Sequence, residues 1–187
     1  SETYDQILCG GAGHQLGRES QMKKQISANA FPAAEHNHDT CIADALDAAQ
    51  ENCRQNGLRF TPLRREVLEI VWGRHAPIGA YEILDELRNE SRSAAPPTVY
   101  RALEFLVENG FVHKIQSLNA FVGCDRPDRE HVGQFLICAA CKQVGELADT
   151  DIAKLIAKKA KAAGFNVLHQ TIEVQGLCRN CADAEHA

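Results

Sequence analysis

Residues 96–122 decide the fold, and they read Pro-Pro-Thr-Val-Tyr-Arg-Ala-Leu-Glu-Phe-Leu-Val-Glu-Asn-Gly-Phe-Val-His-Lys-Ile-Gln-Ser-Leu-Asn-Ala-Phe-Val. The first half begins with prolines that suit a first helical turn, carries apolar residues at helical spacing, and ends at Gly110. The second half, Phe111–Ile115 and Asn119–Val122, is rich in β-forming residues on either side of a polar turn. Several helices followed by such a hairpin are typical of a winged helix.

Three further helices are predicted before this stretch. Apolar residues recur at helical spacing from Cys41 until a glycine stop at Gly57. Thr61 is a candidate N-cap with a proline directly after it, at the first helical position. A third, shorter helix follows Gly79. We therefore expect a winged-helix domain at residues 41–123.

The rest of the chain predicts a tail, a hinge and a second domain. Residues 1–40 show no sustained period, and we expect little fixed structure there. A charged stretch with a proline at residues 124–130 suits a hinge. Residues 131–187 alternate strands with a helix, the last strand being expected at Val167–Val174. The predicted fold class is α+β, a winged helix plus a small C-terminal α/β domain.

Composition narrows the class of protein. No stretch approaches the roughly 20 apolar residues of a membrane helix. Residues 1–20 lack the apolar core of a secretory signal, so we expect a cytoplasmic protein without membrane contact. Reducing compartments rarely use stable disulfides, so eight cysteines favour metal binding or redox chemistry. A net charge of −5 does not exclude DNA as a partner, because DNA contact needs only a basic face.

Two Cys-x-x-Cys pairs, Cys138/Cys141 and Cys178/Cys181, form the first candidate metal site. Each pair can place two thiolates on one tetrahedral ion, and two pairs fill its shell, which predicts a structural zinc. Metal binding would supply on the order of 10 kcal/mol of folding free energy. The alternatives are two redox pairs or buried apolar cysteines. We expect neither pair to begin a helix as a redox motif would, which favours zinc.

Several motifs in one order make the chain resemble the ferric uptake regulator family. Residues 58–68 (Leu-Arg-Phe-Thr-Pro-Leu-Arg-Arg-Glu-Val-Leu) are similar to its second-helix signature, and residues 96–103 to its recognition-helix signature. Residues 111–114 are similar to its wing, and with the cysteine pairs the resemblance covers about residues 41–184. It implies a homodimer, with a C-terminal α/β dimerisation domain and a metal at the hinge that sets DNA affinity.

Within that family the chain resembles the zinc uptake regulators. Iron-sensing members usually carry a His-His-Asp-His cluster before the first cysteine pair. Residues 129–134 here read Arg-Glu-His-Val-Gly-Gln, so only His131 remains. An iron- or peroxide-responsive relative is the alternative within the family.

A second candidate zinc site comes from four separate segments. A thiolate, two imidazoles and a carboxylate suit a tetrahedral zinc and disfavour Mg²⁺ and Mn²⁺, while permitting Co²⁺ or Fe²⁺. The resemblance implies that the zinc branch uses the same four positions for regulation. The four candidate ligands are His113, Cys124, His131 and Glu146. Each also has an alternative role without a metal: Cys124 as an inert buried cysteine, His113 as a cap of the wing strand, His131 as a loop histidine and Glu146 as an exposed carboxylate.

Candidate DNA contacts lie near the starts of three predicted helices. A helix N-terminus in the major groove brings such side chains to base edges and phosphates. Arg101 is the best candidate for a bidentate contact to guanine, while Tyr81 matches a DNA contact of the family. For each arginine alone, a solvated surface charge is the alternative. The full set is Tyr81, Thr98, Tyr100, Arg101, Arg64 and Arg65.

These predictions combine into a zinc-responsive repressor of zinc-uptake genes, with Zn²⁺ as corepressor and two zinc ions per chain. Ligands on both sides of the hinge would link zinc binding to DNA affinity. A zinc protein without a DNA role is the alternative outside this class. A zinc hydrolase is disfavoured because the chain has no His-Glu-x-x-His segment. His36, His38 and Cys41 are either a third metal site or part of a polar tail.

Overall fold

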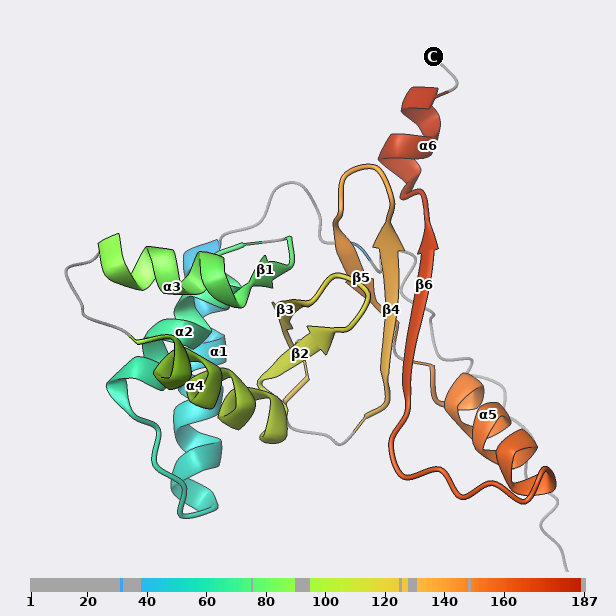
Figure 1. Ribbon diagram of the computed structural model, residues 1–187, viewed down its shortest axis with the longest axis horizontal. Helices are drawn as coiled ribbons and strands as arrows, with labels where there is room; N and C mark the ends of the chain where they lie inside the picture. The colour runs from blue at the N-terminus through green and yellow to red at the C-terminus, as the bar shows by residue number, and fades with distance from the viewer. Residues whose placement is uncertain are drawn as a thin grey trace, which may run out of the picture.

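The structure is a computed structural model of the 187-residue chain. It describes residues 31, 38–74, 76–89, 95–124, 126–127, 131–147 and 149–185. Figure 1 shows a group of helices on one side, a second sheet on the other, and a hairpin between them. The chain is a winged helix followed by a smaller α/β domain, so the predicted fold class is confirmed. Most of the predicted tail, including His36, lies outside the described residues.

The winged helix contains four helices and a three-stranded sheet. The strands pair antiparallel in the order β1-β3-β2. The two-residue strand β1 was not predicted, because Ile78 and Gly79 are too few to show an alternating pattern. The elements are α1 (His38–Gln55), α2 (Pro62–Trp72), β1 (Ile78–Gly79), α3 (Ala80–Asn89), α4 (Pro96–Glu108), β2 (Val112–Ile115) and β3 (Ala120–Gly123).

Local signals place the ends of these helices. The Thr61 side chain accepts a hydrogen bond from the Arg64 N–H at 3.4 Å, which confirms the N-cap of α2. Gly110 has a φ of 72°, a conformation that side chains disfavour. The Phe111 N–H then donates to the Leu106 carbonyl at 2.9 Å, which closes α4 and directs the chain into β2.

The core of the winged helix lies where α1–α4 meet the first sheet. Val67 of α2, Leu87 of α3 and Leu106 of α4 are each fully buried there. Burial of each such side chain contributes about 1.5–3 kcal/mol, so this packing fixes the orientation of α4.

The C-terminal domain is built on a mixed sheet of order β5-β4-β6. Strand β4 runs antiparallel to β5 and parallel to β6. The expected strand at Val167–Val174 starts later, at Thr171, because the preceding residues carry the chain back from α5 to the start of a parallel strand. The elements are β4 (Gly133–Cys138), β5 (Val144–Glu146), α5 (Thr150–Ala162), β6 (Thr171–Gly176) and α6 (Arg179–Glu185).

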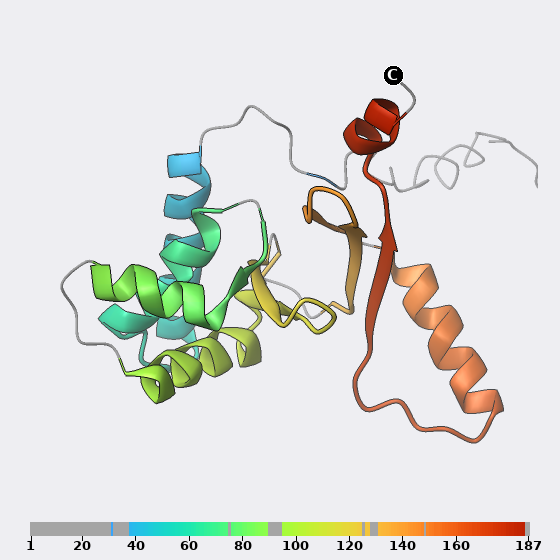
Figure 2. The same ribbon diagram turned by 45° about the horizontal axis from the view of Figure 1, so that its top comes forward.

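Helix α5 leaves an apolar face uncovered within this single chain. No residue of α5 is buried, and Leu155 is 56% exposed. Figures 1 and 2 both show α5 on the side of β6 that faces away from the winged helix. Ile152 and Ile156 add to the same exposed apolar surface.

A second apolar cluster joins the two domains. Ile115 of β2 packs with Phe135 and Ile137 of β4, and Leu118 and Val122 border this contact. The β2–β3 hairpin therefore rests on the C-terminal sheet. Among the described residues, no helix is long and apolar enough to cross a membrane, and the cytoplasmic location stays a prediction.

Candidate metal centres

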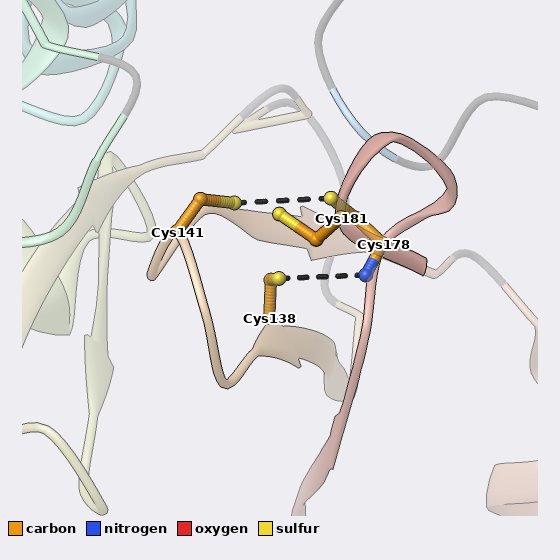
Figure 3. A group of neighbouring side chains, drawn as sticks. All are labelled: Cys138, Cys141, Cys178 and Cys181. Atoms are coloured by element: carbon orange, nitrogen blue, oxygen red, sulfur yellow. Dashed lines mark hydrogen bonds between the residues drawn. The ribbon is translucent and has the colours of Figure 1, made fainter. Parts of the chain in front are cut away.

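The two Cys-x-x-Cys pairs meet at one end of the C-terminal sheet (Figure 3). Cys138 ends β4, whereas Cys178 lies just after β6. Because β4 and β6 are parallel and Cys138 pairs in register with Gly176, both pairs leave the sheet at the same end. Figure 3 shows the side chains of Cys141 and Cys181 turned toward the same centre. Helix α6 begins directly after Cys178, so the expectation that neither pair begins a helix is wrong for this pair.

The distances between the thiols of this Cys₄ cluster match those between the sulfurs of a tetrahedral zinc site. The Sγ atoms of Cys141 and Cys178 are 3.8 Å apart, and all four Sγ atoms lie within 4.8 Å of one another. A tetrahedral zinc with Zn–S bonds of about 2.3 Å separates its sulfurs by about 3.8 Å. The Sγ–Sγ distances therefore fit the ligand shell of a tetrahedral zinc ion. Each Cys-x-x-Cys pair would supply two of its four sulfurs.

Neighbouring groups in the same cluster shift the pKa values of two cysteines in opposite directions. Hydrogen bonds from the backbone N–H groups of Cys178 and Cys141 lower the pKa of Cys138 to about 6. Contacts with the other thiols, that of Cys178 first, raise the pKa of Cys181 to about 12. Several thiolates this close repel one another, and a divalent cation removes that repulsion.

The second candidate site brings together one residue from each of four segments. His113 lies in β2, Cys124 follows β3, His131 precedes β4, and Glu146 ends β5. His131 Nε2 is 2.7 Å from Glu146 Oε1 and 3.1 Å from His113 Nε2. Cys124 Sγ is 3.6 Å from His131 Nε2, and one ligand atom of each residue lies within 4.8 Å of the others. We call this group the hinge cluster.

The residues of the hinge cluster differ in burial: Cys124 is buried, His113 and Glu146 are half-buried, and His131 is exposed. Cys124 is 1% exposed, and the side chain of Glu146 is 8% exposed. Burial, together with the nearby His131, lowers the pKa of His113 to about 4, so this imidazole is neutral at pH 7. The neutral imidazole is the form that binds a metal. A buried thiol, a carboxylate and two imidazoles together fit a divalent cation such as Zn²⁺.

Two close contacts pack against the hinge cluster, one next to Cys124 and one on His113. A Cβ atom added at Gly123 would lie 2.5 Å from the Trp72 ring, so the indole packs directly on the backbone before Cys124. The His113 ring makes an edge contact with the Phe135 ring at a centroid distance of 5.1 Å. These contacts were missed from the sequence, although a glycine directly before a candidate ligand was a signal that space is limited there.

Two of the predicted DNA contacts, Tyr81 and Tyr100, share one surface of the winged helix. Tyr81, at the start of α3, is 70% exposed, and Tyr100 of α4 is 41% exposed. Both tyrosines line one cavity of about 440 Å³ between α3, α4 and the wing. Thr98 and Arg101 are exposed near the start of α4.

The two arginines of α2 differ from each other. The Arg64 guanidinium lies 3.4 Å from the centroid of the Phe105 ring and donates to the Arg59 carbonyl. This arginine is therefore half-buried and held in place by the protein itself. Arg65 is exposed and is the better placed of the two for a phosphate.

The third predicted metal group cannot be assembled from the described residues. His38 begins α1 and Cys41 lies one turn further along, partly buried, while His36 lies outside the described residues. Within the described ranges, the groups of three or more potential ligands are the Cys₄ cluster and the hinge cluster. A site at His36, His38 and Cys41 stays a prediction.

Comparison with known proteins identifies the family. The model of the ferric uptake regulator family matches residues 55–175. The chain belongs to this family. The zinc uptake regulation protein of Escherichia coli (strain K12) is 40% identical over 147 residues, covering 78% of this chain and 86% of that protein. The peroxide operon regulator of Bacillus subtilis (strain 168) is 26% identical over 144 residues, covering 77% and 98%.

Two solved structures share the arrangement of the elements. The crystal structure of holo XcZur matches with a TM-score of 0.71 and 46% identity, covering 75% of this chain and 98% of that one. A zinc uptake regulator complexed with zinc and DNA matches with a TM-score of 0.74 and 37% identity, covering 82% and 100%. The zinc uptake regulation protein of Escherichia coli is thus more similar in sequence to this chain than the peroxide operon regulator of Bacillus subtilis is.

We predict that Gly123→Ala disturbs the hinge cluster through Trp72. The added methyl group would overlap the indole ring, which has to move, and we expect a loss of about 1–3 kcal/mol in the free energy of unfolding. Trp72 is the single tryptophan of the chain, so its fluorescence reports the displacement directly. The matched control is Gly176→Ala, where a Cβ would meet no atom within 4 Å. Equal urea midpoints and equal emission spectra for both variants would contradict the contact.

Proposed function

We propose that this protein is a zinc-responsive, DNA-binding transcriptional repressor that controls zinc-uptake genes, with Zn²⁺ as corepressor. The observation that carries the proposal is the hinge cluster, whose ligands come from both domains. Support comes from a similar structure of a zinc uptake regulator complexed with zinc and DNA. The family consists of regulators, which argues against the alternative of a zinc enzyme.

The hinge cluster couples the two domains through its connectivity. His113 and Cys124 follow the movements of the winged helix, whereas His131 and Glu146 belong to the C-terminal domain. Zinc bound by these side chains would supply a cross-link and neutralise the anionic thiolate and carboxylate. If the linked arrangement is the one that fits DNA, zinc affinity and DNA affinity depend on each other reciprocally.

The Cys₄ cluster has a different role in this proposal. Both of its pairs belong to the C-terminal sheet and to the start of α6, so a metal there would not join the two domains. Four thiolates also leave no open ligand position. We assign it a structural zinc, which gives two zinc ions per chain, and we keep residues 124–130 as the hinge between domains 41–123 and 131–187.

The C-terminal domain is proposed to form the homodimer. The exposed apolar residues of α5 are joined by Phe165 and Leu168, which are 66% and 93% exposed. Strand β6 stands at an edge of its sheet, and Val174 on it is half exposed. A two-fold dimer through this surface would carry two copies of α4, spaced about 34–36 Å apart for successive major grooves.

Sequence-specific DNA contact is assigned to the exposed start of α4. Arg101 is the proposed base-reading residue, with Thr98 and Tyr100 beside it. Tyr81 extends this surface from α3, and Arg65 is assigned to the phosphate backbone. Arg64 is assigned mainly to packing on Phe105, so we expect it to act on DNA through the position of α4.

We predict that Zn²⁺ activates DNA binding more effectively than Fe²⁺ or Mn²⁺. The thiolate of the hinge cluster disfavours Mn²⁺, and similarity to zinc uptake regulators favours Zn²⁺ over Fe²⁺. Fluorescence anisotropy with a duplex selected from random DNA by the zinc-loaded protein measures the activation by each free metal. Activation by Fe²⁺ at concentrations where Zn²⁺ has no effect would favour the iron-responsive alternative. Failure to select any DNA would favour a zinc protein without a DNA role.

We predict opposite consequences for Cys124→Ser and Cys138→Ser. The Cys124 variant should keep one zinc per chain and a folded dimer, but lose zinc-dependent DNA binding, because only the hinge cluster is damaged. The Cys138 variant should lose the structural zinc and unfold its C-terminal domain, at a cost on the order of 10 kcal/mol. Metal content, sedimentation and thermal unfolding measure these outcomes. If the Cys124 variant unfolded and the Cys138 variant did not, the two roles would be exchanged.

We predict that Arg101→Ala weakens binding to the selected duplex by about 1–3 kcal/mol and relaxes specificity at one base pair. A bidentate contact to guanine is lost, while the fold is kept because Arg101 is exposed. The control is Arg88→Ala, an exposed arginine at the end of α3, on which we expect a smaller effect. Competition with single-base variants of the duplex measures the change. An equal loss on specific and random DNA would identify Arg101 as a phosphate contact instead.

A further inference from the structure

The turn between β2 and β3 is bound by a carboxylate of the C-terminal domain. The Gln116 N–H donates to Glu173 Oε1 at 2.6 Å, and the Ser117 N–H donates to Glu173 Oε2 at 3.0 Å. Glu173 lies in the middle of β6, 57 positions along the chain from Gln116. Both ribbon views show the wing turn directed toward the sheet that contains β6 (Figures 1 and 2). One side chain thus satisfies two backbone donors across the domain boundary.

These hydrogen bonds stabilise the ionised form of Glu173. Burial alone would raise the pKa of this carboxyl, but the hydrogen bonds from Ser117 and Gln116 outweigh it and lower the pKa. The carboxylate is therefore charged at neutral pH, and charge-assisted hydrogen bonds are about twice as strong as neutral ones. Without Glu173, the backbone N–H groups of Gln116 and Ser117 would have to hydrogen-bond to water instead.

An apolar contact lies directly beside the hydrogen bonds. Ile115, the last residue of β2, is fully buried against Phe135 and Ile137 of β4. Leu118, in the same turn as the two donors, packs on the edge of this cluster. The wing turn is thus held by a polar contact to β6 and by an apolar contact to β4.

The hinge cluster and the Glu173 contact hold opposite ends of one short strand. His113 is the second residue of β2, and Gln116 directly follows its last residue. A single attachment at His113 would leave β2 free to pivot about that point. A second attachment at the wing turn removes the pivot, and with it the freedom of the winged helix that β2 belongs to.

We propose that Glu173 is a positioning residue that latches the wing turn onto the C-terminal sheet, and that this latch sets the orientation of the winged helix together with the hinge cluster. The inference rests on the proposed function, because it deepens the regulation of the same site. The latch uses no metal ligand, yet it favours the arrangement in which the four ligands meet. By linkage, removal of the latch weakens both regulatory zinc binding and DNA binding.

The test compares Glu173→Gln with Asp151→Asn in the full-length, zinc-loaded chain. Glutamine keeps the size of the side chain but replaces one acceptor oxygen by a donor and removes the charge. Asp151 is the charge-matched control, because its side chain is 89% exposed at the start of α5. We measure affinity for the selected duplex, regulatory zinc affinity, structural zinc content and amide hydrogen exchange of Gln116 and Ser117.

For Glu173→Gln we expect about tenfold weaker DNA binding, weaker regulatory zinc binding and about tenfold faster exchange of the two amides. Structural zinc content and the dimer should be unchanged, which a merely destabilised domain would not allow. The Asp151 variant should match the wild type. Wild-type DNA affinity, wild-type zinc affinity or wild-type exchange in Glu173→Gln would each overturn the proposal.

Amide exchange also separates failure of the latch from failure of the proposed function. If the wild-type chain bound no DNA, the proposed repressor function would fail, while the exchange of Gln116 and Ser117 would still test the latch. If Glu173→Gln did not fold, the wild-type chain would decide. Both amides exchanging in the zinc-loaded wild type as fast as in an unfolded peptide would overturn the latch, and slow exchange that is lost in Cys124→Ser would support it.

Discussion

A thiol, a carboxylate and two imidazoles meet between the two domains, and in the proposed function a metal bound there sets the relative position of the domains. Cys124 and Glu146 become anionic when they act as ligands, and two anions this close in a desolvated place repel each other. A divalent cation bound between the thiolate and the carboxylate would replace their repulsion by the attraction of both to the metal. Because the ligands are divided between the domains, the free energy of metal binding becomes a free energy of domain positioning.

The same chemistry has another consequence when all ligands belong to one domain. In the Cys₄ cluster, β4 and the segment after β6 bring both pairs to one end of a single sheet, so a metal there fixes the sheet and nothing beyond it. A closed thiolate shell also exchanges its metal less readily than a mixed site with one thiolate. In the proposed function, stability and sensing are therefore divided between two sites by the strands that supply the ligands, and both sites would use the same metal.

Local chemistry made much of the fold and of the ligand sets predictable. The cap at Thr61 and the Cys-x-x-Cys pairs are encoded within a few neighbouring residues, while the hinge cluster also needed the family resemblance. The features that were missed depend on distant parts of the chain. Strand β1 exists because it pairs with β3, and β6 starts late because it must run parallel to β4. The packing of Trp72 on Gly123 and the contact of Glu173 with the wing turn have no local pattern at all.

Docking of the wing turn on the C-terminal sheet restricts how this acidic protein can approach DNA. The turn faces its own second domain, whereas the exposed starts of α3 and α4 do not take part in this contact. Along α4, however, Glu104 and Glu108 line the same cavity as Tyr100 and would repel phosphates. Only the first turns of α4, where Arg101 is exposed, can then enter a major groove without that penalty. In the proposed function, the orientation of this helix end sets DNA affinity, and the hinge cluster and the latch would jointly fix that orientation.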